Sequence, residues 1–272
     1  MRKNVKAGNG DKMMDVAVTT ATKFLSCDNK LFIGMTSQLL VETTDAMLEV
    51  RLAVEDKNID AIAKIDEMFA AKLDALETPD QVQMKLRCKY LQKAIRWSDL
   101  MGSIRFGELK LHSLLASALW QSGERGESMS HSALAEEPLV INERLSTVEK
   151  SKEKDVLFCR AVLVLLSTEN LRDANTLSTS YIEGDKRNFD KLAAEFLSKE
   201  VKSKNYAIFC TCLLGICERE KKAGALYTWL LGKFQAHLQQ QPELLPYTTK
   251  IGQTYFNIQP PPSMLKQMQI RG

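Results

Sequence analysis

The chain has 272 residues, of which 44% are hydrophobic and 26% are charged, and its formal net charge at pH 7 is +3. This composition predicts a folded protein with a sizeable core, and the small positive excess gives no reason to expect a nucleic acid partner. The sequence contains no apolar run near the roughly 20 residues that a membrane span requires. We therefore expect no direct membrane insertion.

The cysteines and the first residues of the chain predict a cytoplasmic protein. Most of the six cysteines lie inside apolar helical patterns, and they form no paired framework of the kind seen in secreted domains. The N-terminus, MRKNVKAGNGDK, is charged and contains glycine, unlike a hydrophobic secretory leader. We expect reduced thiols and flexible ends at residues 1–12 and 263–272.

Apolar residues recur with a helical period along almost the whole chain, and strand-like alternation is nearly absent. This pattern predicts an all-α protein. In chain order, the first four helices are expected at residues 13–24, 35–48, 58–76 and 84–97, with Asn58 as the cap of the third.

The middle of the chain contains a weak internal repeat. The apolar spacing of residues 111–119 recurs 47 residues later at 158–166, with Asn170 in the place of Gly123, and a third copy begins near Tyr206. Repeats of this length that are built from helix pairs predict an α-solenoid of stacked antiparallel hairpins, similar to tetratricopeptide repeats.

Two segments interrupt this rhythm. Residues Ser122 to Ser132 are mostly small or polar and predict a loop. Residues Tyr181 to Asn188 are either a loop or a small β-hairpin, because Gly184 followed by Asp185 supplies the positive φ angles that tight turns need.

The sequence offers little for catalysis, cofactors or metals. Cys210 and Cys212 would point apart on a helix, and no histidine or second cysteine pair completes a zinc site. The three histidines are scattered singly and are expected to be structural. Carboxylates such as Asp66 and Glu67 are expected on solvated helix faces. We therefore expect no metal, no cofactor and no enzymatic activity.

The three tryptophans, Trp97, Trp120 and Trp229, fall on apolar stripes at helical spacing. This spacing favours core packing over a role in stacking on bases or ligands.

Two surface features remain near the end of the chain. Basic residues concentrate between Asp185 and Lys222, as a solvated face or as a rim that steers an acidic partner. The last long helix carries an apolar stripe, and the segment from Ile251 to Pro262 adds an aromatic cap before three prolines that cannot continue a helix. The stripe comprises Leu226, Trp229, Leu230, Phe234 and Leu238, and the cap contains Tyr255, Phe256 and Ile258.

Several ordered phrases in residues 13–262 resemble a known family. They are WSDL, LKLHSLLASALWQSGE, DVLFCRAVLVLLSTENLRDAN and YTTKIGQTYFNIQPPP, and the similarity is strongest in NLRDAN and IGQTYFNIQPPP. The chain resembles the Get-four-type scaffold subunit of the guided-entry-of-tail-anchored-proteins pathway, whose mammalian member belongs to the transmembrane-domain recognition complex.

The resemblance implies a non-enzymatic cytosolic α-solenoid that acts as an adaptor. Its N-terminal half, residues 13–135, would recruit a targeting ATPase of the Get-three type. Its C-terminal half, residues 136–262, would hold the N-terminal segment of a ubiquitin-like Get-five-type protein, and a co-chaperone with tetratricopeptide repeats would be reached indirectly. Family members usually have another helix pair ahead of the stretch that matches Met13, so this chain is expected to begin late.

By the same resemblance, the partner-gripping hairpin of the family corresponds to residues 181–188, and the groove is formed by residues 189–201 and the terminal helices. The implied partner-binding residues are Tyr181, Ile182, Lys186, Arg187, Phe189, Phe196, Leu226, Trp229, Leu230, Phe234, Tyr255, Phe256 and Ile258.

Two other functions stay open from the sequence alone. A helical-repeat RNA-binding protein would use the basic residues of 186–222 together with aromatic side chains for stacking. The candidates for stacking are Phe189, Phe196, Tyr206 and Phe209. An enzyme whose site is not visible in the sequence is the second alternative, because helical repeats occasionally carry catalysis.

Overall fold

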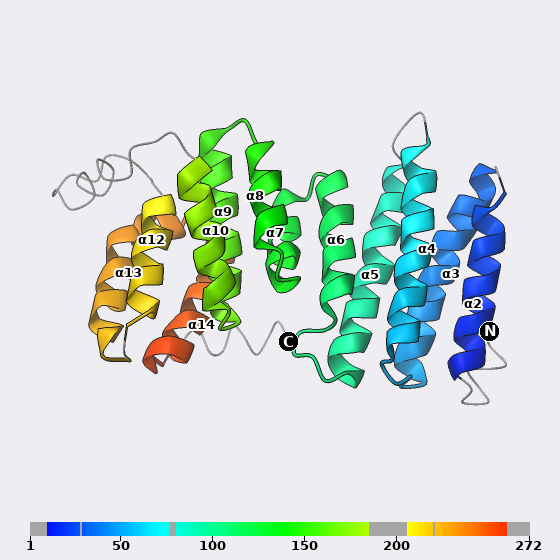
Figure 1. The fold of residues 1–272 in the computed structure, drawn as a ribbon, viewed down its shortest axis with the longest axis horizontal. Helices are drawn as coiled ribbons and strands as arrows, with labels where there is room; N and C mark the ends of the chain where they lie inside the picture. Colours follow the sequence, from blue (N-terminus) through cyan, green and yellow to red (C-terminus); the bar gives the residue numbers. More distant parts are fainter. Residues whose placement is uncertain (1–9, 28, 77–79, 185–205, 220, 260–272) are drawn as a thin grey trace. The chain divides into compact units, whose positions relative to one another are not determined.

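The computed structural model describes residues 10–27, 29–76, 80–184, 206–219 and 221–259. In these ranges every regular element is a helix, and no strand occurs. The expected all-α fold of stacked helix pairs is confirmed (Figure 1). The chain divides into two compact units, Met1–His131 and Ser132–Gly272.

The first unit is built from long helices that pack against their sequence neighbours and against the next helix but one. Its core contains the largest fully buried side chains of the unit, including Trp97, Tyr90 and Phe69. The Trp97 indole N–H also donates to the Leu52 carbonyl at 2.7 Å. Its helices are α2 (Gly10–Leu25), α3 (Lys30–Glu49), α4 (Asp56–Asp74), α5 (Gln81–Met101) and α6 (Leu109–Gln121), and α7 (Arg125–Leu134) crosses the boundary between the units.

The second unit is organised around α9, which packs against α8, α10, α12 and α14. Every residue of α9 from Leu157 to Ser167 except Arg160 is buried, as the apolar run FCRAVLVLL predicts. Its helices are α8 (Pro138–Ser146), α9 (Ser151–Ser167), α10 (Leu171–Gly184), α12 (Tyr206–Cys217), α13 (Gly224–Leu238) and α14 (Leu245–Phe256), with short 3₁₀ turns η1 (Lys221–Ala223) and η2 (Pro242–Leu244).

Four helices end in the same way. At each end one residue has a positive φ, and the N–H of the following residue donates to a carbonyl five positions earlier, which satisfies groups that a helix end leaves unpaired. The left-handed residues are Arg51, Gly123, Glu136 and Glu169, and the bonds are Leu52 to Met47 (3.0 Å), Glu124 to Leu119 (2.9 Å), Glu137 to Ser132 (3.2 Å) and Asn170 to Leu165 (2.9 Å).

This geometry corrects the register of the internal repeat. The residue that corresponds to Gly123 is Glu169, because both have a positive φ, so the repeat spacing is 46 residues and not 47. Asn170 instead caps the next helix. Its side-chain carbonyl accepts from the Asp173 N–H at 3.1 Å, and its amide donates to the Asp173 carboxylate at 2.8 Å.

Two further expectations about helix boundaries are wrong. Asn58 does not cap α4, which begins after Glu55; Asn58 lies inside the helix, is buried, and donates to the Ala53 carbonyl at 3.5 Å. The segment Ser122 to Ser132 is mostly helix α7. Its serines are small enough to be buried, and Ser128 donates to the Ala116 carbonyl at 2.7 Å.

The hairpin alternative is also wrong where it can be compared with the structure. Residues 181–184 form the last turn of α10. The remainder of that segment, residues 185–188, lies outside the described residues, as do 189–201 and the prolines 260–262.

Two polar clusters in the first unit were not expected from the sequence. Asp66 is fully buried rather than solvated, and its carboxylate binds the Arg87 guanidinium at 2.7 and 2.9 Å. His112 and His131, which seemed isolated, share a hydrogen bond of 2.8 Å between their Nδ1 atoms. His112 Nε2 donates to the Phe106 carbonyl at 2.9 Å, so the shared proton belongs to His131. Burial, and then His112, lower the pKa of His131 to about 4.

Candidate partner-binding groove

A groove runs between α13 and α14 in the second unit, and its geometry follows from how α13 is buried. One side of α13 packs into the core through Tyr227, Leu230, Phe234 and Leu238. The Phe234 ring lies 5.0 Å from the ring of Phe209 on α12. The neighbouring side of α13 faces α14 and forms one wall of the groove.

Tyr227 fixes the distance between the two helices. Its hydroxyl donates to the Thr248 carbonyl, and its ring stacks on Phe256 with centroids 4.9 Å apart. A Cβ at Gly252 would lie 3.0 Å from the Tyr227 ring, so glycine is what permits this close approach. Burial is the main cause that raises the pKa of Tyr227, and the hydroxyl therefore stays protonated as a donor.

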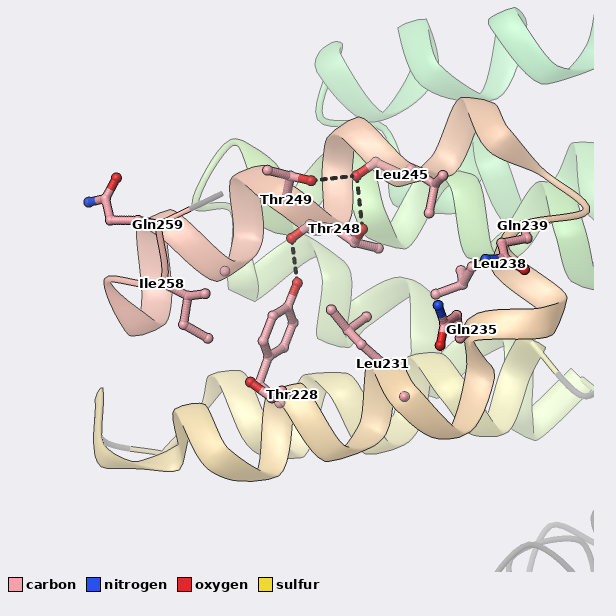
Figure 2. A pocket seen from close by; sticks show the side chains of 13 residues that line it. Thr228, Leu231, Gln235, Leu238, Gln239, Leu245, Thr248, Thr249, Ile258 and Gln259 are labelled. Atoms are coloured by element: carbon pink, nitrogen blue, oxygen red, sulfur yellow. Dashed lines mark hydrogen bonds between the residues drawn. The ribbon is translucent and has the colours of Figure 1, made fainter. Parts of the chain in front are cut away.

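The groove has a volume of about 430 Å³, and no charged residue is among those that line it in the described part of the chain. Figure 2 shows Leu231 of α13 across from Thr248 and Thr249 of α14, with Ile258 at one end. The hydroxyls of Thr248 and Thr249 donate to the Leu245 carbonyl at 2.8 and 3.1 Å, so both are bonded within their own helix. The lining residues are Tyr227, Thr228, Leu231, Gly232, Gln235, Leu238, Gln239, Leu245, Thr248, Thr249, Gly252, Ile258 and Gln259.

Gly232 marks the open part of the α13 wall. A Cβ placed there meets no heavy atom within 4 Å. An uncharged groove with apolar walls and side-chain amides at its ends suits a mainly apolar polypeptide segment better than an ion or a nucleotide.

Comparison with known proteins supplies the family. The family model described as Golgi to ER traffic protein 4 matches residues 8–269. The chain belongs to this family. It is 28% identical over 194 residues to the Golgi to ER traffic protein 4 homolog of Xenopus tropicalis, covering 70% of this chain and 55% of that protein. The homolog of Dictyostelium discoideum is 24% identical over 182 residues, covering 63% and 52%.

A solved structure has the same fold. The crystal structure titled C. therm. Get4 matches with a TM-score of 0.64 and 18% sequence identity, covering 100% of this chain and 86% of that one. The resemblance to a Get-four-type subunit is therefore confirmed at the level of the family. The chain spans just over half the length of the curated relatives that it matches.

Of the residues that the family resemblance assigned to partner binding, those that the structure describes do not all lie on one surface. Tyr181 is buried: it stacks on Phe158 at 4.0 Å and donates to Asp155 at 2.7 Å, while Ile182 beside it is half-buried. Lys186, Arg187, Phe189 and Phe196 lie outside the described residues.

The apolar stripe of α13 divides between two sides of the helix. Leu230 and Phe234 are buried, whereas Leu226 and Trp229 are exposed, Trp229 by 49%. The expectation that all three tryptophans pack in the core is thus wrong for Trp229, while Trp97 is buried and Trp120 half-buried. The Lys233 ammonium lies 5.7 Å from the Trp229 ring centroid.

The aromatic cap contributes to the groove through one residue. Ile258 lines it, Phe256 is buried behind it, and Tyr255 is half-buried with its hydroxyl inside the protein. Burial is the main cause that raises the pKa of Tyr255 to about 12. Leu238 of the predicted apolar stripe also lines the groove, but the other lining residues were not predicted. Thr228, Gln235 and Gln239 are polar and add nothing to the apolar stripe, so the sequence pattern gives no sign that they line a groove.

Other classes of site receive no support from the described residues. These contain no group of three or more histidine, cysteine or acidic side chains placed to hold a metal ion. They also contain no helix that is both long and apolar enough to cross a membrane. Tyr206 and Phe209, proposed for stacking on RNA bases, are buried in α12.

Proposed function

We propose that this member of the Golgi to ER traffic protein 4 family is a non-enzymatic cytoplasmic scaffold for the insertion of tail-anchored proteins into the endoplasmic reticulum. It bridges a ubiquitin-like Get-five-type protein, and through it a co-chaperone, to a targeting ATPase of the Get-three type. The observation that carries the proposal is the uncharged groove between α13 and α14 in a chain that matches the family along residues 8–269.

The groove supports a polypeptide ligand for three reasons. It is open along Gly232, its walls include leucine, isoleucine and threonine side chains, and the contact of Tyr227 with Gly252 fixes the distance between its two walls. An apolar segment of the ubiquitin-like partner would bury its side chains there, while Gln235 and Gln259 offer amides to its backbone.

The test fills the groove without disturbing the fold. In Gly232→Phe the new ring enters open space, so the protein is expected to fold normally and to bind the ubiquitin-like partner at least about tenfold more weakly. The matched control is Gly215→Phe on α12, another helical glycine whose Cβ would meet nothing within 4 Å but which does not line the groove.

Isothermal titration of the full chain with the ubiquitin-like partner measures both variants. Loss of binding in Gly232→Phe alone supports the groove as the docking site. Wild-type affinity in both variants, with unchanged circular dichroism, contradicts it.

A further inference from the structure

The exposed face of α5 carries an excess of positive charge. Of the five basic residues in this helix, Arg87 is buried against Asp66 and Lys93 pairs with Asp45 on α3. The remaining three are Lys85, Lys89 and Arg96, which are exposed and form no ion pair within the described residues.

These three cations lie on one side of the helix, because spacings of four and seven residues return to the same face. They extend over roughly 16 Å, at 1.5 Å per residue. The only acidic residue of α5 is Asp99, near the C-terminal end of the helix, and its carboxylate accepts from the Phe106 N–H at 3.0 Å. The exposed face of α4 differs, because there Asp60, Lys64 and Glu67 alternate in sign.

Exposed apolar residues lie at the C-terminal end of α5 and in the loop that follows it; Leu100, four residues after Arg96, continues the face of the cations. Leu100 is 56% exposed, Ile104 39% and Phe106 37%. Phe106 has a φ of 75°, which a bulky residue rarely adopts. The bond from its N–H to Asp99 and the bond to its carbonyl from His112 hold it there, and the Arg105 guanidinium lies 4.7 Å from the ring centroid. The loop thus keeps an aromatic ring at the surface in a strained backbone.

We propose that this face of α5 docks an acidic polypeptide segment that ends in an apolar side chain. The carboxylates pair with Lys85, Lys89 and Arg96, and the apolar side chain packs on Leu100, Ile104 and Phe106. The positive charges favour an acidic segment by charge complementarity. The exposed apolar side chains favour a protein over a nucleic acid, because phosphate groups would make no favourable contact with them. The surface lies in the first unit and is independent of the groove.

The neighbouring charges also fix the direction of the segment. A pocket of about 540 Å³ that Ile104 helps to line is also lined by Asp56 and Glu108, whose carboxylates would repel further acidic residues. The acidic part therefore runs toward Lys85, and the apolar part lies at Phe106.

Fluorescence anisotropy with defined probes tests the surface on the full chain. The probe is a labelled peptide of about twelve residues, mostly glutamate and serine, ending in leucine and phenylalanine; such a peptide can span the three cations. Comparison probes replace glutamate by glutamine, or the apolar end by serine, and an oligouridylate of similar length represents nucleic acid.

Lys85→Glu/Lys89→Glu is expected to weaken binding of the acidic probe about tenfold or more, and added salt is expected to weaken the wild type in the same direction. Lys64→Glu/Lys152→Glu makes the same change in net charge at exposed positions elsewhere and should alter binding less than about twofold. Leu100→Ser/Ile104→Ser should weaken only probes with the apolar end. Equal effects of the two charge variants, or binding of the oligouridylate as tight as that of the acidic probe, would overturn the proposal.

Discussion

Asp66 and Arg87 form the most buried ion pair in the described part of the chain. Their side chains are 0% and 4% exposed. The Tyr90 hydroxyl donates to the same carboxylate, and Arg87 Nη1 donates to Gln121 at 2.8 Å. Burial of both charges is tolerated because each finds several partners. Burial is the largest cause that raises the pKa of Tyr90, and the nearby Asp66 charge raises it further.

Removing either Asp66 or Arg87 alone should therefore destabilise the fold. Asp66→Leu leaves Arg87 charged inside the unit and is expected to lower the free energy of unfolding by about 3 to 5 kcal/mol. Asp45→Leu breaks the exposed pair with Lys93 and should cost less than about 1 kcal/mol. Urea unfolding of both variants measures the difference, and similar losses would show that burial of the Asp66 pair has no special weight.

Asp66 also shows which feature of the fold could not be predicted from the sequence. The buried face of α4 was predicted correctly through Ile62, Ile65, Phe69 and Leu73, which recur at helical spacing. Asp66 lies one residue after Ile65 on that same face. A carboxylate there reads as solvated unless its partner is known, and Arg87 is 21 residues away on another helix.

Helix ends are the element-scale feature that depends most on backbone geometry. Arg51 and Glu136 occupy left-handed positions that glycine adopts without a steric penalty. Arg51→Gly and Glu136→Gly are each expected to raise stability by about 0.5 to 1 kcal/mol, and Gly123→Ala, with a φ of 86°, should lower it by a similar amount. Thermal unfolding measures all three. A stability loss in both glycine variants would contradict this explanation of the helix ends.

At the same scale, the helices themselves could be predicted from apolar periodicity, whereas three local decisions could not. α7 is hidden in the sequence because small serines rather than leucines fill its contact with α6. Tyr181 continues α10 because its ring and hydroxyl both find partners on α9, which overrides the turn signal of Gly184. The family resemblance implied a groove at the terminal helices, but most of its lining residues could not be predicted, because they come from two helices and are individually ordinary.

At the scale of the whole molecule, the proposed scaffold places different partners on different units. The groove belongs to the second unit, and the ATPase is proposed to dock on the N-terminal half. A bridge of this kind gains from joining two sites in one chain, because a bound partner raises the local concentration of the other. Neither binding event needs to alter the other for bridging to occur.

Bridging predicts a definite result in a three-component capture experiment. With the ubiquitin-like partner immobilised, the ATPase should be retained only when the full chain is added. Gly232→Phe should lose both proteins, because it fills the groove that holds the chain to the partner, while Gly215→Phe should retain both. Retention of the chain without the ATPase would contradict the bridging role and leave the groove intact as a binding site. Retention of the ATPase by the partner alone would make the chain unnecessary and contradict the scaffold itself.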